Sequence, residues 1–222
     1  MSNELMKGRP QVICLPGSVA PAAQRYGPLI NAVGNDAELH TKDLEVYREA
    51  TPAPDYSIEE ELTAIDRFAE SKDLGRFHLV GYSGGGFISL ASAGTRPTFV
   101  REQVRPGAVL APPPSGPPSP EMQKRPAGIA ALIKAFDAYR FDRDQLLAAP
   151  FPVFYGYGDL SHEEQALKAG VLARLFMDFR VNRYAGVHHF VPPEQIYTPQ
   201  HVSALLALWH GAERSAAQAS LQ

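Results

Sequence analysis

The sequence predicts an α/β fold with one mostly parallel sheet of about six strands, flanked by helices. Short apolar runs rich in β-branched or aromatic residues alternate with segments of helical periodicity, which is typical of repeated βα units. The 222 residues suit one domain, and 45% apolar with 20% charged residues can build a packed core. We therefore expect a single domain over residues 1–222.

The elements follow one another along the chain in the order that βα units require. The expected strands are residues 11–15, 38–44, 76–81, 107–111, 152–156 and 179–184. The expected helices are residues 22–33, 58–72, 85–95, 163–177 and 195–212. Two helix starts carry a capping box, in which a serine oxygen and a later glutamate satisfy free backbone N–H groups: Ser57 with Glu60, and Ser161 with Glu164.

A proline-rich stretch interrupts this alternation. Seven of the fifteen residues in 112–126 are proline, which excludes a helix interior or a central strand. A helical apolar stripe follows it. We therefore expect residues 112–150 to form an insertion after the strand at 107–111, a rigid loop leading into a helix. The alternative is a Pro-x-x-P ligand for an SH3-like module, from Pro114 to Pro117.

The charge and the cysteine content limit which classes of partner the protein could bind and in which cellular compartment it is expected. Lys and Arg number 21 against 24 for Asp and Glu, so the net charge of −3 gives no basic field for nucleic acid. No apolar run reaches the roughly 18 residues that span a bilayer. The start lacks the apolar stretch of a signal peptide, and the single Cys14 cannot form an intrachain disulfide. A cytoplasmic protein is expected; the oligomeric state is not predicted.

One motif carries chemistry: a Gly-x-Ser-x-Gly pattern that ends an apolar strand and begins a helix, Gly81-Tyr82-Ser83-Gly84-Gly85. A nucleophile on such a sharp turn has a strained backbone, and the residues two before and two after it crowd each other. Gly81 and Gly85 meet this need, so Ser83 is the candidate nucleophile. The alternative is a glycine-rich turn that binds phosphate through its amides, but the Gly-Lys-Ser/Thr of a P-loop is missing.

An acid and a base follow at later strand ends. A serine hydroxyl needs a neighbouring base, which a third group orients. Asp159 ends a glycine-rich turn after the strand near 152–156, and His188 and His189 follow the strand at 179–184. The order Ser, Asp, His is the one expected for this architecture. Asp159 has a plainer alternative role, which is to hold the backbone of its own turn.

These residues resemble the serine hydrolases of the α/β-hydrolase superfamily over nearly the whole chain. The resemblance implies His189 as the base, with His188 as the alternative, because the family's usual ending is similar to His189-Phe190-Val191-Pro192-Pro193-Glu194. It also implies an oxyanion hole made by the backbone amides of Ser18 and Gly84. Pro16 stands where the family commonly has histidine, a departure that leaves a backbone donor in place.

In that family an insertion at this point is a cap over the site. Leu132, Phe136 and Tyr139 lie on its apolar stripe and are the candidate substrate-binding residues. The alternative is that the stripe only packs the cap onto the core. The cap is short for the family, which predicts an open site for small to medium esters.

The expected reaction is acyl transfer to water by a carboxylic ester hydrolase, lactonases included. Its rate should fall as the base is protonated, near histidine's ordinary pKa of about 6.5. A thioesterase or a carbon–carbon bond hydrolase with the same residues is an alternative, as is a non-catalytic ligand-binding protein. The dehalogenase branch of the family carries aspartate in place of Ser83, so it is disfavoured. No cofactor is expected, and no metal, because consecutive histidines point apart.

Overall fold

A computed structural model describes residues 8–18, 20–92, 117–140 and 151–219, which fall into two compact units. The first unit holds the described residues up to 92 together with 117–140, and the second holds 151–219. The strand expected at 107–111, the densest prolines at 112–116 and the end of the insertion at 141–150 lie outside the described residues.

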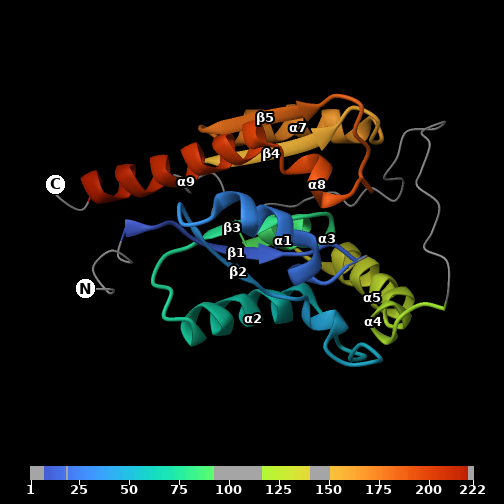
Figure 1. Ribbon diagram of the computed structural model, residues 1–222. Helices are drawn as coiled ribbons and strands as arrows, with labels where there is room; N and C mark the ends of the chain where they lie inside the picture. The colour runs from blue at the N-terminus through green and yellow to red at the C-terminus, as the bar shows by residue number, and fades with distance from the viewer. Residues whose placement is uncertain (1–7, 19, 93–116, 141–150, 220–222) are drawn as a thin grey trace. The chain divides into compact units, whose positions relative to one another are not determined.

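The first unit is built on three parallel strands in the order β2-β1-β3. They are β1 (Gln11–Leu15), β2 (Glu38–Thr41) and β3 (His78–Gly81). In the centre, Val12 to Leu15 are completely buried, as a strand covered on both faces should be. Helix α1 (Ala22–Val33) joins β1 to β2, and α2 (Ile58–Ser71) joins β2 to β3. Because such crossovers are right-handed, these helices lie on opposite faces of the sheet (Figure 1).

Two boundaries of the first unit show how neighbours limit an element. Strand β2 ends at Thr41 rather than at residue 44, because its partner β1 ends and the last ladder bond runs from the Lys42 N–H to the Cys14 oxygen, 3.1 Å. A 3₁₀ helix, η2 (Glu45–Tyr47), follows instead. The capping box at Ser57 is confirmed in its serine half: the Ser57 hydroxyl accepts the Glu60 N–H at 3.3 Å and starts α2.

The described part of the insertion, residues 117–140, contributes two helices to the first unit, α4 (Pro120–Gln123) and α5 (Arg125–Ala138). The buried side of α5 follows helical spacing and consists of Arg125, Gly128, Leu132, Ala135 and Phe136. Leu132, Ala135 and Phe136 belong to the same apolar core as Ile13 of β1 and Ile88 of α3 (Gly84–Ser92). The inserted helix is therefore part of the core of this unit.

The described residues of the second unit form two parallel strands, β4 (Val153–Gly158) and β5 (Phe179–Tyr184), with Val153 opposite Phe179. Helix α7 (Glu164–Leu175) connects them, and α8 (Pro193–Ile196) and α9 (Pro199–Ala219) follow (Figure 1). No helix in the described part of the chain combines the length and the apolar character that a membrane span requires.

Two expectations for the second unit are wrong. The single helix expected at 195–212 is two helices, because Pro199 disfavours a helical conformation at Thr198. The capping box at Ser161 does not form: α7 begins at Glu164 without a side-chain cap from Ser161. The Ser161 N–H is held instead by the Gly158 oxygen, 3.1 Å, and the His162 Nδ1 accepts the Glu164 N–H at 3.4 Å.

Candidate active site

Ser83 lies on a strained turn between β3 and α3. Its φ of 53° is in the left-handed region, which costs a residue with a side chain about 1–3 kcal/mol. A Cβ on Gly81 would collide with the Gly85 carbonyl, and a Cβ on Gly85 would lie 2.5 Å from the Pro16 oxygen. Only glycine fits at both positions, so the turn has the geometry that the sequence pattern predicts.

The loop after β1 packs directly against this turn. The Gly85 N–H donates to the Pro16 oxygen at 3.0 Å. A Cβ on Gly17 would lie 2.9 Å from the Ser83 Cβ, and one on Gly84 would lie 3.3 Å from the Ser18 Oγ. The two residues expected to supply oxyanion amides, Ser18 and Gly84, are therefore neighbours at the N-terminus of α3. The helix dipole favours negative charge there.

Tyr82, the residue before the nucleophile, is held by a contact that the sequence did not reveal. The guanidinium of Arg25, on α1, lies 3.5 Å from the centre of the Tyr82 ring, and Arg25 is buried. Burial raises the pKa of Tyr82, and the Arg25 charge acts in the opposite direction. This stack attaches the turn to a second helix. Nothing in the spacing of a lone arginine on α1 signals such a contact.

The three candidate substrate-binding residues of the insertion are all buried. Leu132 and Phe136 lie 3.8 and 3.9 Å from the Cβ position of Gly84, and Phe136 stacks on Phe87 with ring centroids 3.8 Å apart. Tyr139 donates its hydroxyl to the Ala91 oxygen at 3.5 Å, toward the far end of α3. These contacts show packing of the inserted helix onto the core. Substrate contact stays a prediction for all three, with Leu132 and Phe136 adjacent to Gly84.

The first turn of α5 is fastened to Tyr47 of η2, another residue that the sequence analysis did not single out. The Arg125 guanidinium lies 4.0 Å from the centre of the Tyr47 ring. The Lys124 ammonium donates to the Tyr47 carbonyl at 3.3 Å. Gly128 leaves the space that the ring fills, since a Cβ there would collide with it. An isolated glycine within a helical pattern is the one sequence signal of this close approach.

In the second unit, Asp159 follows β4 and holds the turn after β5. Its Oδ1 accepts the Gly186 N–H at 2.8 Å, and Gly186 has a φ of 70°. Its Oδ2 lies 3.6 Å from the Arg183 Nη2, and its own N–H donates to the Tyr184 oxygen at 2.9 Å. Asp159 thus holds the turn after β5, which is a structural role. Its catalytic role stays a prediction.

The histidine loop lies beside the Asp159 loop at the carboxyl ends of the two strands. The Leu160 N–H donates to the Val187 oxygen at 3.0 Å, and a Cβ on Gly158 would lie 3.2 Å from the His188 nitrogen. The His188 Nδ1 accepts the Phe190 N–H at 3.0 Å, so the His188 ring stabilises the backbone of its own loop. The His189 ring meets the Phe190 ring edge-on, with centroids 5.1 Å apart. Asp159 and His189 lie in the second unit, and Ser83 in the first.

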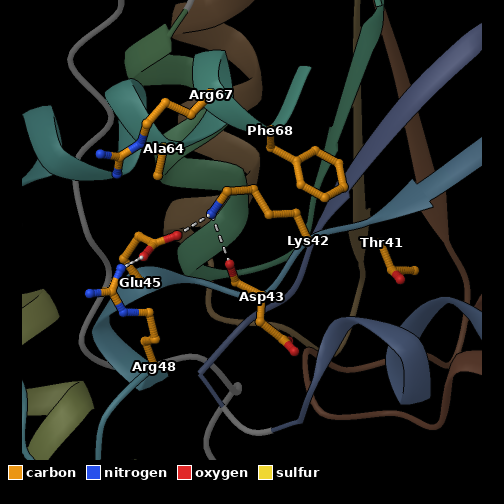
Figure 2. Close-up of a pocket in the computed structure, with 8 residues that line it drawn as sticks. All are labelled: Thr41, Lys42, Asp43, Glu45, Arg48, Ala64, Arg67 and Phe68. Carbon is orange, nitrogen blue, oxygen red and sulfur yellow. Dashed lines mark hydrogen bonds and ion pairs between the residues drawn. The ribbon is translucent and has the colours of Figure 1, made fainter. Parts of the chain in front are cut away.

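A pocket of about 430 Å³ lies elsewhere in the first unit, between the end of β2 and α2. Figure 2 shows that three of its charged side chains, those of Lys42, Glu45 and Arg48, pair with one another. Lys42 donates to the Glu45 carboxylate at 3.0 Å, and Arg48 donates to the same group at 3.2 Å. None of the predicted site residues lines this pocket. Among the described residues, no group of three or more His, Cys, Asp or Glu side chains could hold a metal ion.

The family model of the alpha/beta hydrolase family matches residues 12–221. The chain belongs to the alpha/beta hydrolase family. This membership supports a hydrolase activity and agrees with the parallel strands flanked by helices in both units. No curated relative matches the sequence.

Several solved structures share the fold of this alpha/beta hydrolase. MenH from S. aureus is 15% identical, with a TM-score of 0.64, and the match covers 93% of this chain and 95% of that one. A haloalkane dehalogenase loop variant from Bradyrhizobium elkanii is 14% identical, with a TM-score of 0.66 and coverage of 98% and 93%. The carboxylesterase CesB (YbfK) from Bacillus subtilis is 16% identical, with a TM-score of 0.57 and coverage of 92% and 85%. Identities this low show the fold alone.

Proposed function

We propose that this alpha/beta hydrolase is a serine hydrolase that cleaves carboxylic esters, either small to medium acyl esters or lactones. The observation that carries the proposal is the left-handed backbone of Ser83, on a turn where only glycine fits on either side. Strain of this kind persists only where the surroundings enforce it, and it clusters at functional sites. On such a turn the hydroxyl stands at a helix N-terminus, where developing negative charge is stabilised.

In the proposed first step, Ser83 attacks the ester carbonyl carbon while His189 takes the hydroxyl proton. Asp159 orients the imidazole and stabilises its charged form. The backbone amides of Ser18 and Gly84 bind the oxyanion, each contributing about 3–4 kcal/mol of transition-state stabilisation when aimed at it. The carbon–oxygen bond to the leaving alcohol then breaks, and His189 returns its proton to that alcohol.

The second step hydrolyses the acyl-enzyme through the same groups. His189 takes a proton from water, the hydroxide oxygen bonds to the acyl carbon, and the bond to Ser83 breaks as Ser83 regains a proton. Two contacts support the roles given to the second unit. The loops that carry Asp159 and His189 lie side by side. Asp159 uses Oδ1 for Gly186, and its Oδ2, which lies 3.6 Å from the Arg183 Nη2, has a second lone pair that could accept from an imidazole.

The family and the composition support the class of substrate. Serine rather than aspartate at position 83 favours ester cleavage over dehalogenation. One of the solved structures with this fold is named a carboxylesterase. The net charge of −3 disfavours nucleic acid as a partner, and the single cysteine suits a cytoplasmic enzyme. The proposed substrate is a small molecule, and the proposed reaction needs no membrane and no cofactor.

Covalent labelling with a fluorophosphonate tests the nucleophile. The wild type should be labelled once, and Ser83→Ala should not be labelled at all, because the phosphonate bonds to the activated hydroxyl. Ser92→Ala is the matched control, an exposed serine on the same helix, and it should be labelled like the wild type. An unlabelled wild type would overturn the proposal in favour of a non-catalytic protein.

The bond that is cleaved is tested on a panel of p-nitrophenyl esters, lactones and acyl thioesters. Small to medium esters or lactones should have the highest kcat/KM, and Ser83→Ala should show only the uncatalysed rate. Butyrate esters should be cleaved at least as fast as long-chain esters. A clear preference for thioesters would replace the ester assignment and leave the role of Ser83 intact.

A further inference from the structure

The first turn of α1 lies against the candidate nucleophile turn. Arg25 contacts the residue before Ser83, since its guanidinium lies 3.5 Å from the centre of the Tyr82 ring. The next residue of the helix, Tyr26, donates its hydroxyl to the Leu15 oxygen at 2.7 Å. The same oxygen accepts the Tyr82 N–H at 3.1 Å. Helix α1 therefore contacts the turn directly through Arg25 and indirectly through the end of β1.

The Tyr82 ring is confined by two elements. The Arg25 guanidinium covers the ring and is buried, with Arg25 only 6% exposed, so water screens this contact little. The loop after β1 is equally close: a Cβ on Gly17 would lie 2.9 Å from the Tyr82 Cδ1 and 2.9 Å from the Ser83 Cβ. Because one peptide bond joins Tyr82 to Ser83, a shift of this ring would also shift the backbone of the nucleophile.

The first turn of α1 is itself fixed by a side chain from another segment. Pro21 precedes the helix, and a proline side chain has no acceptor for a cap. The Asp43 carboxylate, just after β2, accepts the Ala22 N–H at 2.7 Å and so supplies the missing cap. Its negative charge also suits the N-terminal end of the helix dipole. Arg25 therefore projects from a helix end that is held in place.

A packing role alone would not require arginine at this position. Methionine has a side chain of similar length and could cover the Tyr82 ring without moving a positive charge out of water, which is costly. A cation over an aromatic face is attracted to it most strongly where solvent is excluded. The ring in question belongs to the residue that leads into the strained backbone of Ser83, whose φ is 53°. Such strain persists only where the surroundings enforce it, and Arg25 is part of those surroundings.

We propose that Arg25 is a positioning residue of the serine hydrolase: its guanidinium holds the Tyr82 ring against the loop after β1 and thereby keeps the Ser83 hydroxyl aimed at the ester carbonyl. Arg25 acts through Tyr82 and does not touch the substrate in this role. The inference rests on the proposed function, since Ser83 must be the nucleophile for its position to matter. A displaced nucleophile reacts slowly while the substrate still binds, so the loss should appear in kcat rather than in KM.

Two substitutions of Arg25 separate positioning by the guanidinium from simple packing. Arg25→Met keeps a long side chain beside the ring and removes the cation, while Arg25→Lys keeps a positive charge. With p-nitrophenyl butyrate, well below the Tm of each variant, kcat of Arg25→Met should fall about tenfold or more with little change in KM. The kcat of Arg25→Lys should lie between those of the wild type and Arg25→Met. An unchanged kcat in Arg25→Met would overturn the proposal, as would a kcat in Arg25→Lys no higher than in Arg25→Met.

A double-mutant cycle shows whether Arg25 acts through Tyr82. Tyr82→Phe keeps the ring, so Arg25→Met should lower kcat in that background as much as in the wild type. Tyr82→Leu removes the ring, so there Arg25→Met should change kcat less than about twofold. The same tenfold loss in both backgrounds would overturn the route through Tyr82. If Tyr82→Leu does not fold, the single variants of Arg25 still decide the proposal.

The labelling rate of Ser83 gives a second measure that does not depend on the choice of ester. Arg25→Met should react with a fluorophosphonate about tenfold more slowly than the wild type. Arg67→Met, which removes an exposed arginine from α2 of the same unit, should react like the wild type and have its kcat and KM. A lower Tm in Arg25→Met with an unchanged labelling rate would show that Arg25 is only structural and would overturn its positioning role. An unlabelled wild type would instead overturn the serine hydrolase itself.

Discussion

The strand ends of the two units carry their candidate catalytic residues by different means. In the first unit the Ser83 turn is enclosed by backbone: Val12 to Leu15 of β1 are completely buried, and the contacts at positions 81 and 85 require glycine. In the second unit, β4 and β5 are largely half-buried or exposed, and Asp159 holds its neighbours through hydrogen bonds. The nucleophile is positioned by excluded volume and the acid by directed polar contacts. Substitutions that change size should therefore affect the first region most, and those that change charge or polarity the second.

The largest effect should come from adding one methyl group in the first region. In Gly85→Ala the new Cβ would lie 2.5 Å from the Pro16 oxygen and still closer to the Leu15 oxygen, both of them backbone atoms that cannot move cheaply. We expect a loss of more than about 4 kcal/mol in unfolding free energy, together with loss of labelling. Chemical denaturation measures the unfolding free energy, and reaction with a fluorophosphonate measures the labelling of Ser83. Gly75→Ala, with nothing within 4 Å of its Cβ position, should unfold like the wild type.

The next largest effect should come from the second region, where substitution of His189 and of His188 should change different properties. His189→Ala removes the proposed base, so kcat should fall by about 10⁴-fold or more. His188→Ala removes only the acceptor for the Phe190 N–H, 3.0 Å away, so it should lower stability more than kcat. Steady-state kinetics and thermal unfolding of both variants measure the two quantities. The reverse pattern would assign the base to His188.

Asp159→Asn sharpens the contrast between charge and geometry. The amide oxygen of asparagine can still accept the Gly186 N–H, so the turn should be kept while the negative charge is lost. Ester hydrolysis should then fall by about 10³–10⁴-fold with little change in Tm. Asp159→Ala should lose activity and also lower the Tm. Full activity in Asp159→Asn would show that Asp159 serves the turn alone.

The smallest effect concerns pH. Burial lowers the pKa of His201, whose Nδ1 lies 2.9 Å from the Ile196 oxygen in the second unit. A histidine whose folded pKa lies below its unfolded value of about 6.5 stabilises the fold above that pH, and this contribution is lost as the pH falls through and below it.

The contribution of His201 to the unfolding free energy should therefore decrease from pH 7 to pH 5. His201→Gln should flatten the slope, by at most about 1.4 kcal/mol per pH unit for one proton. His40, in the first unit, also has a pKa lowered by burial, but it is less buried and the charge of Glu38 opposes the shift. His40→Gln should therefore flatten the slope less. If both variants flattened the pH slope of the unfolding free energy equally, the two histidines would not differ as the two regions predict.

The sequence predicted those elements whose conformation depends on residues close together in the chain. The Ser83 turn follows from the glycine pattern, because a Cβ on Gly81 would collide with the Gly85 carbonyl only four residues later, although the glycine at 85 is also required by the Leu15 and Pro16 oxygens. The Ser57 cap likewise depends on Glu60 three residues later. The same reasoning fails at Ser161, where the backbone is tied to the turn after β4 and the helix starts later.

The sequence by itself thus determined the parallel βα order of the described strands and helices, the family resemblance and the strained serine turn, since periodicity and short-range sterics encode them. Only the tertiary structure decided which groups end up buried together. The inserted helix joins the core through Leu132 and Phe136, Asp159 binds the backbone of Gly186, and the Arg125 guanidinium stacks on the Tyr47 ring. These contacts join residues 27 or more positions apart, so no local pattern specifies them. Burial depends on which faces meet in the folded chain.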